Sequence, residues 1–158
     1  AHRKANGWFE RGEVSKCYEA FAERPAPASA TPPSTAPLAL PDVGKEVTWK
    51  SKLAKGKKRA YVSDVIGKDS LTRVVRLEDG PSATHWNLWP LTGRSHQLRF
   101  ELFQHGCPIL GDVLYGSLTP WADGIALRVF HVDFRKCKDA SALGLPPEFR
   151  TDGLPTPG

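Results

Sequence analysis

Between residues 46 and 91 the chain consists of short runs of strand-forming residues separated by turn residues, which limits the fold more than any other feature. The four candidate strands form two pairs, residues 47–53 with 59–65 and residues 71–77 with 84–91. The segment between the members of each pair contains glycine, as tight turns require. Because strands joined by tight turns pair in opposite directions, we expect a mostly antiparallel sheet.

The rest of the chain adds two more candidate strands and few helices. The expected strands are residues 15–22 and 125–134, and the expected helices are residues 1–12 and 95–104. The second helix has Ser95 as a candidate N-cap and Gly106 just beyond its end. The class predicted from this order is α+β, with a mostly antiparallel mixed sheet and few helices.

Two segments rich in proline interrupt or follow this pattern. Six of the 14 prolines fall within residues 23–41, where we expect a flexible loop that contributes nothing to a core. Residues 141–158 hold four more prolines and three glycines, and we expect this tail to lie across the surface. The length of 158 residues is typical of one domain, which we expect at residues 1–140.

Positive charge is concentrated in one part of the chain. The formal net charge is +5, yet residues 45–76 contain ten basic and three acidic residues. A basic stripe on a slightly acidic body suits a polyanion, nucleic acid first. A solvated hairpin without a partner fits the charges equally well. If RNA binds here, the candidate contacts are Lys50, Lys52, Lys55, Lys57, Lys58 and Arg59.

Several functional classes lack their signatures. A segment that crosses a membrane needs about 18 apolar residues in a row, and the sequence has no such run. Residues 1–7 are not followed by the apolar segment of a signal peptide. Cys17, Cys107 and Cys137 are too few and too scattered for a disulfide framework, so we expect reduced thiols in a cytoplasmic protein. The sequence shows no phosphate-binding loop, and its histidines lack the spacing of metal ligands.

Residues 86–116 hold the best candidates for a site. Arg94 falls where a strand ends and a helix begins, a junction at which arginine and free backbone N–H groups bind anions. A surface salt bridge is the alternative for Arg94. His96 and Gln97 are placed to orient a base, a phosphate or Arg94, although a histidine satisfied by a neighbour is the simpler reading. Arg99 is either a second phosphate contact or a surface charge.

Longer motifs in this region resemble a known family. The runs LTGRSHQLR at 91–99 and GCPILGDVLYG at 106–116 closely resemble a signature block of the RluA family of RNA pseudouridine synthases. VSKCYEA at 14–20 and GKDSLT at 67–72 agree with two further segments of that family. The resemblance covers most of residues 1–135. It implies a pseudouridine synthase-like catalytic domain that isomerises uridine in rRNA or tRNA without metal or cofactor.

The resemblance also implies roles for single residues. Arg94 matches the arginine that pairs with the catalytic aspartate, and Tyr18 matches the tyrosine that stacks on the target base. Leu98 matches an apolar residue of the pocket wall. Without the resemblance, we would read Tyr18 as a core aromatic residue. Glu101 stands where the family often has histidine.

One essential part of the family pattern is absent. No His-Arg-Leu-Asp block, which carries the catalytic aspartate, occurs in the sequence. We therefore expect a C-terminal part of the catalytic domain that is inactive alone and pairs with the missing N-terminal half. Residues 15–22 would then expose an unpaired sheet edge. The alternatives are a non-catalytic RNA-binding module of the same origin and an unrelated phosphate-binding protein, which the length of the match disfavours.

Overall fold

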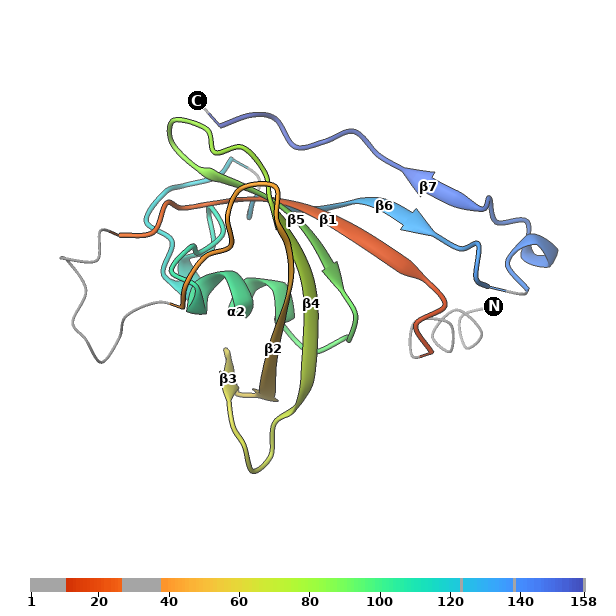
Figure 1. Ribbon diagram of the computed structural model, residues 1–158, viewed down its shortest axis with the longest axis horizontal. Helices are drawn as coiled ribbons and strands as arrows, with labels where there is room; N and C mark the ends of the chain where they lie inside the picture. The colour runs from red at the N-terminus through yellow and green to blue at the C-terminus, as the bar shows by residue number, and fades with distance from the viewer. Residues whose placement is uncertain (1–10, 27–37, 123, 138, 158) are drawn as a thin grey trace.

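The computed structural model describes residues 11–26, 38–122, 124–137 and 139–157. They form one seven-stranded sheet in the order β3-β2-β4-β5-β1-β6-β7, and every neighbouring pair is antiparallel (Figure 1). The strands are β1 Ser15–Ala22, β2 Glu46–Lys55, β3 Ala60–Val62, β4 Lys68–Arg76, β5 Thr84–Pro90, β6 Leu127–Asp133 and β7 Glu148–Arg150. The expected α+β class with an antiparallel sheet is confirmed.

Among the described residues, the α-helical part is a single helix, α2 Gln97–Gln104, accompanied by two short 3-10 helices. The 3-10 helices are η3 Val113–Tyr115 and η4 Ser141–Leu143. Figure 1 shows α2 against one face of the sheet, beside β2 and β4. The helix expected at residues 1–12 and the loop expected at 23–41 lie largely outside the described residues.

Both expected hairpins form, but the first has different limits. β2 pairs with β3 and β4 pairs with β5, as the sequence predicts. β3 ends at Val62 instead of continuing to residue 65, because the chain turns there, with the Gly67 amide donating to the Ser63 carbonyl at 2.9 Å. Val65 is 92% exposed at this turn, so no packing holds it in a strand.

The strand β1 lies inside the sheet, which corrects the expectation of an exposed edge. It pairs with β5 on one side and with β6 on the other. A register shift between Cys17 and Tyr18 interrupts the pairing with β6. Neighbours from residues 84–90 and 127–133 thus satisfy its backbone groups, so the ends of the sheet are β3 and β7.

The main core fills the space between the sheet and α2. Trp86 and Leu88 of β5 are fully buried, and Leu98 and Leu102 of α2 pack in the same cluster. Each such side chain contributes about 1.5–3 kcal/mol through burial. The Trp86 indole also donates a hydrogen bond of 2.8 Å to the Thr84 hydroxyl, so its one polar atom is satisfied.

The two ends of α2 differ in how well the sequence predicts them. Gly106 follows the helix with φ +78°, as expected for a glycine stop. The expected N-cap Ser95 is wrong: the cap position is His96, which has φ +54° and makes no side-chain capping bond. The Gln97 side chain holds the preceding turn instead, and Ser95 is exposed.

The C-terminal tail joins the sheet. β7 pairs with β6, and the amide of Thr151 donates to the Phe130 carbonyl at 2.9 Å. Farther along, the amide of Leu154 donates to a Glu19 carboxylate oxygen at 2.6 Å. The tail therefore continues along the face of β1 that is turned away from α2.

Candidate active site

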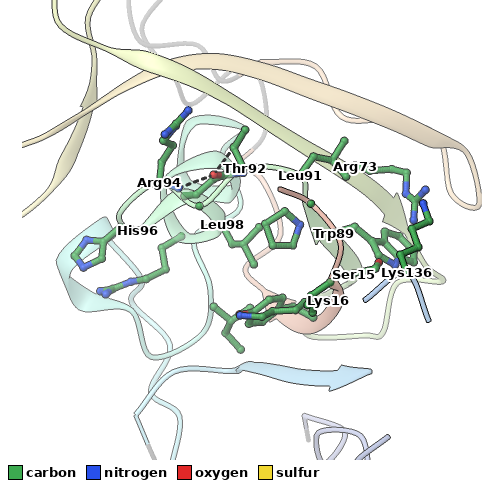
Figure 2. A pocket seen from close by; sticks show the side chains of 18 residues that line it. Ser15, Lys16, Arg73, Trp89, Leu91, Thr92, Arg94, His96, Leu98 and Lys136 are labelled. Atoms are coloured by element: carbon green, nitrogen blue, oxygen red, sulfur yellow. Dashed lines mark hydrogen bonds between the residues drawn. The ribbon is translucent and has the colours of Figure 1, made fainter. Parts of the chain in front are cut away.

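A cavity of about 550 Å³ lies where β5 ends and the chain turns into α2. β1 contributes Lys16 and Tyr18 to its wall, and the turn and α2 contribute Arg94, His96 and Leu98. Figure 2 shows Arg94 and His96 at one end, with Leu98 and Lys16 nearer the middle. The sequence-predicted residues Tyr18, Arg94, His96, Gln97, Leu98 and Arg99 all line this one space.

Gln97 fixes the turn that carries Arg94. Its buried side-chain oxygen accepts hydrogen bonds from the Thr92 hydroxyl at 2.7 Å and the Arg94 amide at 3.0 Å. Its side-chain nitrogen donates at 2.9 Å to the Leu71 carbonyl and to the Thr72 hydroxyl on β4. The side chain thereby joins the turn to the sheet, which gives Gln97 a positioning role.

Arg94 is oriented by backbone groups and keeps donors available. Its Nε atom donates to the Asp69 carbonyl at 2.7 Å, and its amide is held by Gln97. Within the described part of the chain, no hydrogen bond occupies its two Nη atoms. A guanidinium fixed at Nε presents these remaining N–H groups as a fork that suits a carboxylate or a phosphate.

His96 is held by the buried ring of Tyr115. Its Nδ1 atom lies 2.9 Å from the Tyr115 hydroxyl, which also accepts a hydrogen bond from the Ala60 amide at 2.8 Å. A phenol that accepts from Ala60 is free to donate to an unprotonated Nδ1. Burial and the nearby Arg99 lower the pKa of His96, which favours that neutral form. The reading of His96 as a histidine satisfied by a neighbour therefore fits the structure.

Arg99 pairs with a buried carboxylate. Its Nε and Nη2 atoms donate to the two oxygens of Asp112 at 2.7 and 2.8 Å. The side chain of Asp112 is 1% exposed, whereas that of Arg99 is 23% exposed. We would expect an aspartate at this tight turn to bond the backbone, but its side chain makes no such cap. The contact of Arg99 with RNA stays a prediction.

Burial changes the acidity of two side chains contributed by β1. It raises the pKa of the Tyr18 phenol, so the phenol stays neutral at pH 7. It lowers the pKa of the Lys16 ammonium. Tyr18 is half-buried beside the apolar wall that includes Leu98, which is compatible with both a stacking ring and a core aromatic residue.

Several residues that line the cavity were not among the site residues predicted from the sequence. Arg73, Trp89 and Lys136 line the end of the cavity that lies away from His96 (Figure 2). Arg73 and Trp89 are partners in the register of β4 and β5. Burial alternates along both strands. Because Thr72 and Leu88 are buried in the core, the adjacent Arg73 and Trp89 face the other side of the sheet, and this alternation was the available signal.

The six basic residues predicted to bind RNA at residues 50–59 do not line the described part of this cavity. Lys50 and Lys52 flank Ser51, which contacts Glu101 of α2, so they project from the opposite face of β2. Arg59 lies over the rings of Phe103 and Tyr115 at 4.7 and 5.0 Å. Their contacts with RNA stay predictions.

Replacement of Gln97 by glutamate tests its positioning role. The carboxylate retains the two acceptor contacts with Thr92 and Arg94 but loses both donor contacts with β4. Because the Leu71 carbonyl would then face an oxygen, we expect the free energy of unfolding to fall by about 1–3 kcal/mol. Urea unfolding at pH 7 measures the change. The exposed neighbour Ser95, replaced by alanine, is the control and should lose less than about 0.5 kcal/mol.

Neither a metal cluster nor a membrane-spanning helix is found among the described residues. No three histidine, cysteine, aspartate or glutamate side chains there are grouped so that they would hold a metal ion. The helices in the same part of the chain are too short or too polar to cross a bilayer.

In a comparison with known proteins, the sequence relatives and structural neighbours described below are all named as pseudouridine or pseudouridylate synthases. No protein-family model matches the chain. The Dual-specificity RNA pseudouridine synthase RluA of Vibrio cholerae is 40% identical over 70 residues, which are 43% of this chain and 29% of that protein. The bovine RNA pseudouridylate synthase domain-containing protein 1 is 49% identical over 53 residues, or 31% of this chain and 17% of that protein. The matches to the first bacterial relatives thus span about a third of their length.

The fold agrees with solved structures of similarly named human proteins. Human RNA Pseudouridylate Synthase Domain Containing 1 has a TM-score of 0.60 and 24% identity, covering 84% of this chain and 54% of that one. Human RNA Pseudouridylate Synthase Domain Containing 4 also has a TM-score of 0.60, with 17% identity, and covers 96% and 62%. At these identities the likeness concerns the fold. Together with the sequence matches, it shows that the chain is similar in sequence and in fold to RluA-type RNA pseudouridine synthases.

Proposed function

We propose that the chain is the C-terminal part of the catalytic domain of an enzyme that converts uridine in RNA to pseudouridine. The observation that carries the proposal is the cavity that combines Tyr18 of β1 with Arg94 and Leu98 of the turn and α2. These are the positions at which the sequence resembles the family. Its relatives are named as RNA pseudouridine synthases.

In this reaction the base is detached from C1′, turned, and joined again through carbon 5. The target nucleotide must leave its stack, at a cost of a few kcal/mol. Stacking on the Tyr18 ring offsets part of that cost, since a base–aromatic contact contributes about 1–3 kcal/mol. The neutral phenol is also available to assist proton handling at carbon 5. Leu98 supplies an apolar wall beside the ring.

Arg94 would hold the carboxylate on which the chemistry depends. Its two Nη groups, which no described residue occupies, match the two oxygens of an aspartate, and an ion pair keeps that aspartate charged and oriented. No described residue that lines the cavity is acidic. We therefore propose that the aspartate comes from an N-terminal half of the domain outside these 158 residues, and that the chain alone does not isomerise uridine.

The RNA partner is proposed to be ribosomal or transfer RNA. The names of the relatives include a dual-specificity RNA enzyme and a ribosomal large-subunit enzyme, which supports both classes equally. We also propose a cytoplasmic location. The proposal is supported by the three buried cysteines, which form no disulfide: Cys17, Cys107 and Cys137.

Pseudouridine formation by the 158-residue chain is the direct test. With tRNA and rRNA transcripts we expect RNA binding but no product, measured by mass spectrometry of nucleosides. When a segment carrying the His-Arg-Leu-Asp block is fused before the chain, we expect product, and Arg94→Gln should then reduce the rate about 100-fold or more. The fusion with Arg128→Gln, an exposed site outside the cavity, is the control. Product from the chain alone would contradict the external aspartate.

A further inference from the structure

The end of the cavity away from Arg94 contains a cation stacked on an aromatic ring. The Arg73 guanidinium carbon lies 4.7 Å from the centre of the Trp89 ring, and the two residues are cross-strand partners. Ser15 of β1 and Lys136 line the same end (Figure 2). A guanidinium stacked on an indole keeps its N–H donors in the plane, where they remain available to an anion.

The electrostatics of the whole cavity favour an extended anion. Five lysines and arginines line it, and none of its described lining residues is acidic. These cations are Lys16, Arg73, Arg94, Arg99 and Lys136. Arg99 is neutralised by Asp112, whereas among the described residues the only ion-pair partner of Arg73 is the exposed Glu46, at 3.6 Å. The positive charge at the Arg73 end is therefore in excess of what the fold itself balances.

The Arg73 side chain is accessible and incompletely bonded. It is 38% exposed, and its Nε atom makes no hydrogen bond although it is buried. Because Arg94 and Arg73 lie at opposite ends of the cavity, one small anion does not engage both (Figure 2). A polyanion with regularly spaced charges, such as a nucleic-acid backbone, does.

We propose that Arg73, Trp89 and Lys136 form a subsite for a backbone phosphate of RNA, belonging to a nucleotide that flanks the one held near Arg94. The inference rests on the proposed function, which supplies the RNA. Arg73 donates from its edge while Trp89 fixes its plane, and Lys136 adds a second positive charge. The subsite holds the strand in register without reading its bases.

The salt dependence of RNA binding tests this subsite. The 158-residue chain is titrated into a fluorescein-labelled tRNA stem-loop between 50 and 300 mM KCl, and the logarithm of the association constant is plotted against the logarithm of salt. Each phosphate contact that is lost makes the slope shallower by about 0.7–0.9. We expect this change for Arg73→Gln and for Lys136→Ala, with no such change for Arg128→Gln, the charge-matched control.

The conservative variant separates charge from geometry. Arg73→Lys keeps the positive charge but loses the planar fork and the stack, so we expect weaker binding with a nearly unchanged slope. Slopes of Arg73→Gln and Lys136→Ala equal to that of the unchanged chain would overturn the subsite while leaving the proposed function intact. Absence of RNA binding by the unchanged chain would instead count against the proposed function. Circular dichroism of each variant verifies that the fold is retained.

Discussion

Replacement of Arg99 by methionine is expected to lower the free energy of unfolding by about 3–5 kcal/mol. The change leaves the carboxylate of Asp112, which is 1% exposed, buried without its partner. Arg99 stabilises this carboxylate through an ion pair with two hydrogen bonds. Urea unfolding at pH 7 measures the loss.

Two further variants isolate the cause of that loss. Adding Asp112→Asn to the Arg99→Met chain should restore part of the stability, because a neutral amide costs less to bury than a charge. Arg135→Met breaks an ion pair with Asp133 at an arginine that is 65% exposed, and should cost less than about 1 kcal/mol. A loss of that small size for Arg99→Met would show that the buried carboxylate does not need its partner.

Replacement of Gly111 by alanine is expected to cost about 2–5 kcal/mol. Gly111 has φ +82°, a conformation that costs a residue with a Cβ atom about 1–2 kcal/mol. The added Cβ would also lie 2.1 Å from the Gly124 carbonyl oxygen and 2.8 Å from the Trp121 Cβ. Moving these atoms apart adds about 1–3 kcal/mol. Thermal and urea unfolding measure the total.

Gly116 separates the two contributions at Gly111. It has φ +90°, but a Cβ atom there meets nothing within 4 Å. Gly116→Ala should therefore cost only the conformational part, about 1–2 kcal/mol. Equal losses at the two glycines would mean that the close approach of residues 111 and 124 contributes nothing.

The local parts of the fold were predictable from the sequence, whereas the order of the strands was not. Both hairpins were predicted from runs of strand-forming residues separated by turns that contain glycine. The two strands of each hairpin are neighbours in the chain, so the signal is local. The internal position of β1 depends on pairing with β6, more than 100 residues away, and no local pattern encodes that contact. The length of β3 was overestimated because Val65 and Ile66 favour strands but have nothing to pack against.

The site shows the same division. Arg94 was predicted from its place at a strand-to-helix junction, and Tyr18 from a motif that resembles a family. The fold brings both to one cavity. Arg73 and Trp89 meet through the register of β4 and β5, which single residues do not reveal. Asp112 was interpreted from its turn alone, so its pairing with Arg99 was missed.

The internal position of β1 affects how the chain folds during synthesis. β1 leaves the ribosome before both of its partners, which follow at residues 84–90 and 127–133. The hairpins of residues 46–90 have their partners nearby and are free to form while synthesis continues. The nascent chain therefore keeps the apolar side chains of β1, such as Phe21, unprotected until residues 127–133 have been synthesised, which makes this strand a natural contact for chaperones.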